Sequence, residues 1–205
     1  MIKLAKGTSL WGRDYLPAGI LVGLLFAAEF FLVAQALRFT SAAHTVVLLY
    51  TAPIFVALGL HWKLPSERLS LIQWLGIACA FFGIVIAFLF RPAASQAAAS
   101  SALWGDALAL LAGVLWAATT IAVRLTKLAE APATQTLFYQ LFIAFLVLLP
   151  VAFFMGQATI HWSVLSLTSL LFHTVVVSFA SYLIWFWLLK KYLASQLGVF
   201  SFLTP

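Results

Sequence analysis

LRFTSAAHTVVLLYTAPIF, residues 37–55, has a pattern that returns near the C-terminus as LKKYLASQLGVFSFLTP, residues 189–205. In each copy an apolar stretch ends in one or two basic residues, a short link with a small residue follows, and a second apolar stretch runs into a proline. An offset of 152 residues places Ala42 on Ala194 and Pro53 on Pro205. Similarity within one chain at a fixed offset indicates an internal repeat.

The composition defines the broad class of protein. Hydrophobic residues make up 65% of the 205 residues, charged residues only 8%, and the mean hydropathy is +1.12. Ordinary soluble domains are about half apolar and a quarter charged, so we expect a polytopic membrane protein. The formal net charge of +6 does not indicate a nucleic-acid partner, because the 11 basic residues lie singly or in pairs between apolar runs.

Six apolar runs each have the roughly 20 residues that a helix needs to cross a bilayer. These runs are residues 17–37, 43–62, 71–90, 105–123, 136–155 and 168–189, and a seventh begins at Leu193. We therefore expect an all-α bundle of transmembrane helices. The gap at residues 91–104, RPAASQAAASSALW, is rich in alanine and serine, which predicts a flexible linker.

Lysine and arginine are distributed unequally between the two sides of the predicted bundle. Nine lie on one side: Lys3, Lys6, Arg13, Lys63, Arg68, Arg124, Lys127, Lys190 and Lys191. The other side has only Arg38 and Arg91. Cytoplasmic loops carry an excess of these residues. We therefore expect the segment before the first span to be cytoplasmic and the linker at residues 91–104 to be external.

The repeat is expected to be inverted. The offset carries the first span onto the sixth, five crossings later, so the two copies run through the membrane in opposite directions. Inverted repeats are common in secondary transporters. By the same offset a complete protein has ten helices as five plus five, so we expect this chain to be a fragment. Residues 1–90 then form the last part of a first repeat, 91–104 the external linker, and 105–205 the first part of a second repeat.

Three stretches of the sequence resemble the EamA family of the drug/metabolite transporter superfamily. They are ALRFTSAAHTVVLLYTAPIF at 36–55, ERLSLIQWLGIACAFFGIVI at 67–86 and GDALALLAGVLWAATTIAVR at 105–124. Members of that family are ten-helix carriers with two inverted five-helix repeats. The resemblance implies export of amino acids or related small metabolites across a bacterial inner membrane, by alternating access and without ATP. It does not determine the substrate.

Small residues form a stripe along each of two predicted spans, and such stripes let another helix approach closely. The third span has Gly76, Ala80 and Gly83, and the fourth has Gly105, Ala109, Gly113 and Ala117. We expect both stripes to pack against other helices.

Two further features suggest either structural or functional roles. Pro53 falls within the second span, where proline kinks a helix. Pro205 repeats it, so the pair is a candidate hinge, although packing geometry explains the kinks equally well. Glu67, at the start of the third span, is either part of a gate or a cap that meets the positive end of its own helix dipole, and we favour the cap.

Polar and aromatic residues near midspan are candidate substrate-binding residues, because inverted-repeat carriers place their sites near the bilayer midplane. They are Glu29, Tyr50, Trp116, Thr120, Ser181, Tyr182 and Trp185. We take Glu29 as the one acid within a span, and a charged acid there costs about 2.5–3.5 kcal/mol on insertion scales. We expect it to receive a substrate ammonium or to accept a proton, and its repeat partner is Ser181. The alternative is a neutral, hydrogen-bonded glutamic acid that only ties helices together.

The sequence does not favour an enzyme. The four histidines and five acids are scattered singly, without an HxxxH pattern or a pair of acids, so we expect no catalytic site, no metal site and no cofactor. The expected partners are a small-molecule substrate and the lipid bilayer. A second class of protein, a structural or lipid-handling membrane protein, has no need of polar residues at midspan.

Overall fold

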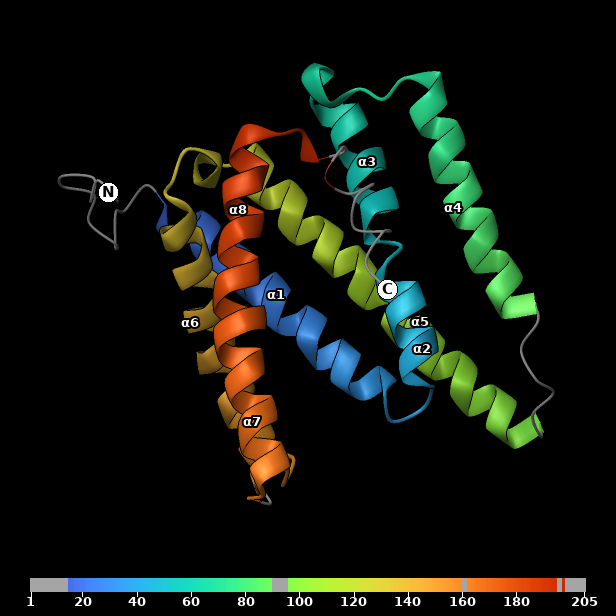
Figure 1. The fold of residues 1–205 in the computed structure, drawn as a ribbon, viewed down its shortest axis with the longest axis vertical. Helices are drawn as coiled ribbons and strands as arrows, with labels where there is room; N and C mark the ends of the chain where they lie inside the picture. The colour runs from blue at the N-terminus through green and yellow to red at the C-terminus, as the bar shows by residue number, and fades with distance from the viewer. Residues whose placement is uncertain (1–14, 90–95, 160–161, 195–196, 198–205) are drawn as a thin grey trace. The chain divides into compact units, whose positions relative to one another are not determined.

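The computed structural model describes residues 15–89, 96–159, 162–194 and 197. These residues form helices and no strands (Figure 1). In chain order the elements are α1 (Leu16–Ala36), α2 (Ala42–Leu49), α3 (Ala52–Lys63), η1 (Pro65–Glu67), α4 (Leu71–Leu89), α5 (Gln96–Leu125), η2 (Lys127–Ala129), α6 (Ala133–Phe154), α7 (Val164–Phe172), η3 (His173–Ser181) and α8 (Tyr182–Lys191).

Five helical segments within the described residues are long and apolar enough to cross a membrane. They are Leu16–Ala36, Ala42–Lys63, Ser101–Leu125, Ala133–Phe154 and Val164–Lys191. The third predicted span corresponds to α4, which has 19 residues but is not among these five, because only the shorter segment Leu71–Gly83 is found as an apolar helix. Large apolar side chains such as Trp62 and Phe154 are almost fully exposed, and extensive apolar exposure marks a surface that contacts lipid. The all-α polytopic membrane fold expected from the sequence is confirmed.

The helices pack into two compact units. Residues 1–24 and 122–187 form one, which we call the α6 unit. Residues 25–121 and 188–205 form the other, which we call the α5 unit. The units do not coincide with the predicted repeats, because a repeat is defined by sequence similarity and a unit by contacts. The division into repeats therefore remains a prediction.

Close helix contact in the α6 unit depends on two glycines of α1. A Cβ at Gly19 would lie 2.5 Å from Cγ of Tyr139, and a Cβ at Gly23 would lie 2.5 Å from Cβ of Ile143. Both pairs of positions are four residues apart, so α1 and α6 meet along matching helical faces. The first turns of α1 therefore pack directly onto α6.

In the α5 unit, small residues of α5 lie at the contact with α1, α2 and the loop between them. Ala109 is fully buried and packs in a cluster with Ala36 and Leu48. A Cβ at Gly105 would lie 2.8 Å from the backbone nitrogen of Thr40, and Ala117 is also buried. The predicted stripe of the fourth span thus faces neighbouring elements of the same unit.

The small-residue stripe of the third span does not face neighbouring elements in the described part of the chain. Gly76 and Gly83 are exposed, and a Cβ at either position would meet nothing within 4 Å. The side chain of Ala80 lies outside the described residues. Contrary to expectation, the described part of the chain packs no helix against these two glycines. Spacing along a helix shows that a face is flat, and it carries no information about what lies opposite.

The predicted linker also differs from the structure. α5 begins at Gln96 and continues to Leu125, so residues 96–104 belong to a helix and not to a flexible connection. Alanine has the highest helix propensity of any residue, and this effect outweighs that of the serines in the segment. Residues 91–95 lie outside the described residues.

The sixth predicted span is not a uniform α-helix. Between α7 and α8, η3 is a π-helix over His173–Ser181. π-helical turns are rare and frequently occur at functional sites. Ser181 closes this segment, and its Oγ donates a hydrogen bond to the Val177 carbonyl at 2.5 Å. Two predicted site residues, Ser181 and Tyr182, therefore lie where the π-helix returns to an α-helix.

Candidate functional site

The second predicted span is broken near its middle. α2 ends at Leu49 and α3 begins at Ala52, so Tyr50 and Thr51 lie between the two helices. The Thr51 backbone N–H donates to the Leu48 carbonyl at 3.1 Å, and the Thr51 hydroxyl donates to the same oxygen at 2.6 Å. These bonds span three residues where an α-helix spans four. The chain therefore tightens at Thr51 before α3 starts.

Pro53 explains the position of the break. It is buried in the first turn of α3. Proline lacks an N–H, and its ring clashes with the carbonyl four residues earlier in a continuous helix, which here belongs to Leu49. The kink expected at Pro53 is thus a full interruption of the helix just before it. Pro205, the other candidate hinge residue, lies outside the described residues.

Gly113 of α5 lies directly against the break. A Cβ at Gly113 would lie 3.0 Å from the Leu48 carbonyl oxygen, 3.0 Å from Oγ1 of Thr51 and 3.1 Å from the Leu49 carbonyl oxygen. Two carbonyls and a hydroxyl of the broken span therefore approach the bare Cα of one glycine. The absence of a side chain at Gly113 is what lets α5 come this close.

An aromatic pair stands beside the break. The rings of Tyr50 and Trp116 meet edge to face, with centroids 5.8 Å apart and an interplanar angle of 78°. Both side chains are half-buried. Thr120 is buried and lies four residues after Trp116, on the same face of α5. Three of the seven predicted site residues thus belong to one region, where ring faces and peptide carbonyls are groups that attract an ammonium.

Glu29 is buried within α1, with 5% of its surface exposed. Its Oε2 has no hydrogen-bond partner among the described residues. The hydrogen-bonded structural role that we considered as the alternative therefore finds no partner at this oxygen. Burying a carboxylate oxygen without a hydrogen-bond partner is costly. Glu29 belongs to the same unit as Tyr50 and Trp116, although no described hydrogen bond joins it to them.

The remaining three predicted site residues belong to the α6 unit. Ser181 is exposed at the end of η3, and Tyr182 and Trp185 are half-buried in α8. Each unit is described by itself, so these residues are not assigned to the same site as the aromatic pair. Their role, and the pairing of Ser181 with Glu29, remain predictions.

Sequence reasoning missed a polar cluster at the start of the fourth span. Asp106 of α5 is buried, and its Oδ1 accepts a hydrogen bond from the Thr40 hydroxyl at 2.6 Å. Nδ1 of His44 lies 3.5 Å from the same oxygen. The expectation that Glu29 is the only acid buried within a span is therefore wrong. The sequence contained one signal, a lone acid among apolar residues at the start of the predicted fourth span.

Glu67 also differs from expectation. It is 1% exposed and lies in η1, before α4 begins. Its Oε1 accepts a hydrogen bond from the backbone N–H of Ala194 at 3.2 Å. A helix begins at Ala194, where the Leu197 N–H bonds to the Leu193 carbonyl at 3.1 Å. Glu67 thus caps a different helix from the one that we expected, 127 residues away in the chain.

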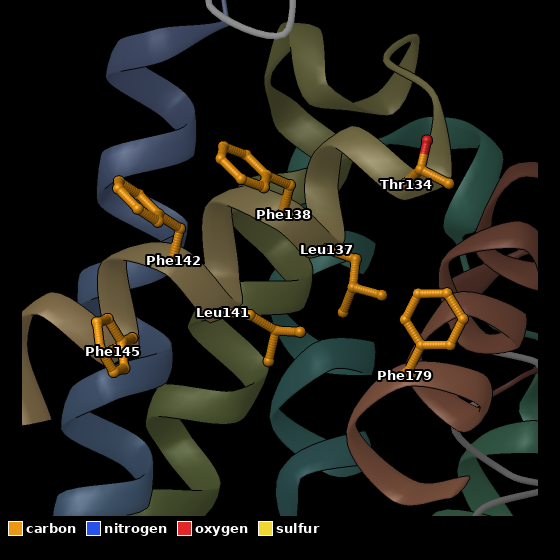
Figure 2. A pocket seen from close by; sticks show the side chains of 7 residues that line it. All are labelled: Thr134, Leu137, Phe138, Leu141, Phe142, Phe145 and Phe179. Atoms are coloured by element: carbon orange, nitrogen blue, oxygen red, sulfur yellow. The ribbon is translucent and has the colours of Figure 1, made fainter. Parts of the chain in front are cut away.

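The α6 unit contains an apolar groove of about 420 Å³. Figure 2 shows Leu137 and Leu141 of α6 pointing toward Phe179 of η3, and Thr134 also lines the groove. Phe138, Phe142 and Phe145 complete the lining. Thr134 is the only polar residue in this set, so the groove suits a hydrocarbon more than a charged metabolite. None of the predicted substrate residues lines it.

Among the described residues no three histidine, cysteine, aspartate or glutamate side chains come together as metal ligands. His44 and Asp106 are a pair without a third such group. The groups described at the broken span can bind a ligand by stacking, by hydrogen bonding and by attraction between a cation and carbonyl or ring electrons.

A helical membrane protein with a span interrupted beside buried polar and aromatic groups has the construction of a membrane carrier. Comparison with known proteins agrees: the chain belongs to the EamA-like transporter family, which it matches over residues 2–89 and 103–205. It is thus a multi-pass membrane protein of a transporter family.

Two relatives are similar along most of the chain. The "Uncharacterized transporter YoaV" of Bacillus subtilis (strain 168) is 25% identical over 195 residues, covering 94% of this chain and 65% of the relative. An "Uncharacterized transporter" of Archaeoglobus fulgidus is 26% identical over 199 residues, covering 95% of this chain and 65% of the relative. The chain therefore spans about two thirds of the length of these relatives. No solved structure matches it.

Proposed function

We propose that the protein is a secondary transporter that exports amino acids or related small metabolites across a bacterial inner membrane by alternating access. The observation that carries this proposal is the broken span at Tyr50 and Thr51. Inverted-repeat carriers hold their substrates at such interruptions, where backbone groups freed from the helix meet the ligand. The family membership supports transport, and the two relatives are also named as transporters.

In this proposal the substrate binds beside the aromatic pair. The rings of Tyr50 and Trp116 stack on an apolar or aromatic part of the substrate, and the Leu49 carbonyl attracts its ammonium group. Thr120 supplies a hydroxyl on the same face of α5. Glu29 binds the ammonium or takes up a proton at another stage of the cycle, because a buried, unpaired carboxyl is stabilised either by a cation or by protonation.

The proposed orientation places the segment before α1 in the cytoplasm. The count of nine basic residues against two supports it. The N-terminal ends of α2 and α5, with Asp106, then lie at the external side. η1 with Glu67, and the end of α8 with Lys190, lie at the cytoplasmic side.

Flux measurements test the function. The full-length protein is reconstituted in proteoliposomes and assayed for uptake and exchange of a panel of labelled amino acids. We expect saturable exchange of one chemical class, with unlabelled members of that class competing. Proteoliposomes that show no saturable flux for any amino acid or related metabolite would contradict the proposal.

The competing function is lipid handling, which the apolar groove of the α6 unit favours. A lipid-handling protein would move a fluorescent phospholipid between leaflets in the same proteoliposomes. We expect no such movement. Lipid movement together with an absence of amino-acid flux would decide for the alternative.

A further inference from the structure

Two buried carboxylates reach across the predicted repeat boundary. Glu67, in the first repeat, accepts a hydrogen bond from the backbone of Ala194 in the second. Asp106, in the second repeat, accepts one from the Thr40 hydroxyl in the first. Both are at most 6% exposed. Each repeat therefore contributes one acid that is bonded to the other.

The two segments contacted by these acids are equivalent in the repeat. The 152-residue offset pairs Ser41 with Leu193 and Thr45 with Leu197. In the structure the Thr45 N–H bonds to the Ser41 carbonyl at 3.0 Å, and the Leu197 N–H bonds to the Leu193 carbonyl at 3.1 Å. Both copies thus begin their helix at the same place. Each acid therefore contacts the start of one of these two equivalent helices.

The two starts differ in how they are capped. Ser41 caps α2 itself, because its Oγ accepts a hydrogen bond from the His44 N–H at 3.2 Å. Leucine has no side-chain acceptor, so Leu193 cannot do the same for the second copy. Glu67 supplies an acceptor to the first N–H of that helix. In the first repeat the helix start is therefore capped by its own residue, Ser41. In the second repeat the equivalent start is capped by Glu67, which belongs to the first repeat.

We infer that Glu67 and Asp106 are positioning residues that latch the two repeats together at opposite faces of the membrane. Glu67 closes the cytoplasmic face, and Asp106 closes the external face. This inference rests on the proposed function, because an alternating-access carrier must open one face while the other stays closed. Both contacts are made in this structure. Release of one contact frees the start of one of these two helices and opens that side only.

Thiol labelling of two matched buried alanines tests the latches. Ala57 packs with Leu69 and Ile77 on the side of Glu67, and Ala109 packs with Ala36 and Leu48 on the side of Asp106. Each is at most 2% exposed. Single cysteines are introduced at positions 57 and 109 of the full-length protein, in a Cys79→Ser background without other cysteines. A membrane-impermeant maleimide is applied to inside-out vesicles for Ala57→Cys and to intact cells for Ala109→Cys.

We expect Glu67→Ala to increase the labelling rate of Ala57→Cys by about fivefold, the effect of losing one hydrogen bond between the repeats. Labelling of Ala109→Cys should not increase. Asp106→Ala should increase the labelling rate of Ala109→Cys and leave that of Ala57→Cys unchanged. Glu67→Gln retains an acceptor oxygen and should stay close to wild type. Equal increases at both cysteines in either variant, or no increase at all, would show that these acids do not control separate faces.

A second substitution separates a latch from a simple cap. Leu193→Ser gives the second copy the cap that Ser41 provides in the first. In Glu67→Ala/Leu193→Ser we expect thermal stability to recover while labelling of Ala57→Cys stays high, because the helix is capped but the repeats are no longer joined. If labelling also returns to the wild-type rate, Glu67 is only a cap and the latch is refuted. Failure of the double variant to fold would equally count against this account.

Labelling is measured without any substrate. A protein that moves no amino acid but shows side-specific labelling would therefore refute the proposed substrate and leave the latches in place.

Discussion

Substituting Gly113 by alanine tests how the broken span is held. The new Cβ would lie 3.0 Å from the Leu48 carbonyl oxygen, about 0.4 Å inside the 3.4 Å at which ordinary contact begins. The Leu49 carbonyl oxygen, at 3.1 Å, is nearly as close. Backbone carbonyls cannot rotate away as a flexible side chain can, so α5 and the broken span must move apart.

The expected change in the free energy of unfolding of Gly113→Ala follows from two opposing effects. Overpacking of a close contact costs about 1–3 kcal/mol. Replacing glycine by alanine within a helix contributes about 0.5–1 kcal/mol in the other direction. Gly83 supplies the matched control, because it also lies within a helix and a Cβ there would meet nothing within 4 Å. Gly83→Ala therefore receives only the favourable effect, and the two variants should differ by about 1–3 kcal/mol.

Thermal unfolding in detergent, followed by tryptophan fluorescence, measures this difference. For a protein of this size each kcal/mol corresponds to a Tm change of about 2–4 °C. We therefore expect Gly113→Ala to unfold roughly 2–12 °C below Gly83→Ala. Equal Tm values for the two variants would refute the close contact at the break. A lower Tm for Gly83→Ala would show that α4, and not α5, has the tightly packed stripe.

Three further predictions concern transport and topology. Trp116→Ala should raise the apparent KM for the substrate about fivefold, through the loss of roughly 1 kcal/mol of stacking. Trp62→Ala, at a position 89% exposed, should leave KM unchanged, and equal effects of the two substitutions would refute the stacking site. Glu29→Gln keeps the shape of the side chain but cannot take up a proton. We therefore expect the variant to fold and its flux to be lost or to become independent of pH, and a wild-type pH profile of flux would exclude coupling through Glu29. Single cysteines at the exposed positions Ser66 and Gln157 should label with an impermeant reagent in intact cells only at Gln157, and labelling at Ser66 alone would reverse the proposed orientation.

The break at Tyr50 and Thr51 was predictable only in part. Pro53 indicates a distortion because its ring and its missing N–H act on its own helix. That effect is local, so it can be inferred from sequence. Whether the helix bends or stops depends on what receives the displaced carbonyls. Here Gly113 of α5 leaves room for them, and the helix stops.

The sequence by itself determined the class of protein, the approximate positions of five of the six predicted spans and the family. In hydrocarbon every backbone group must be bonded within its own helix, so about 20 apolar residues are enough to predict a span. Only the tertiary structure decided which small-residue stripe is packed and what the buried acids bind. Gly113 and Gly83 occur in similar patterns, and the difference between them is whether another helix lies opposite. Asp106 and Glu67 have partners 66 and 127 residues away. No local pattern specifies such pairings, because they depend on the relative placement of helices that are distant in the chain.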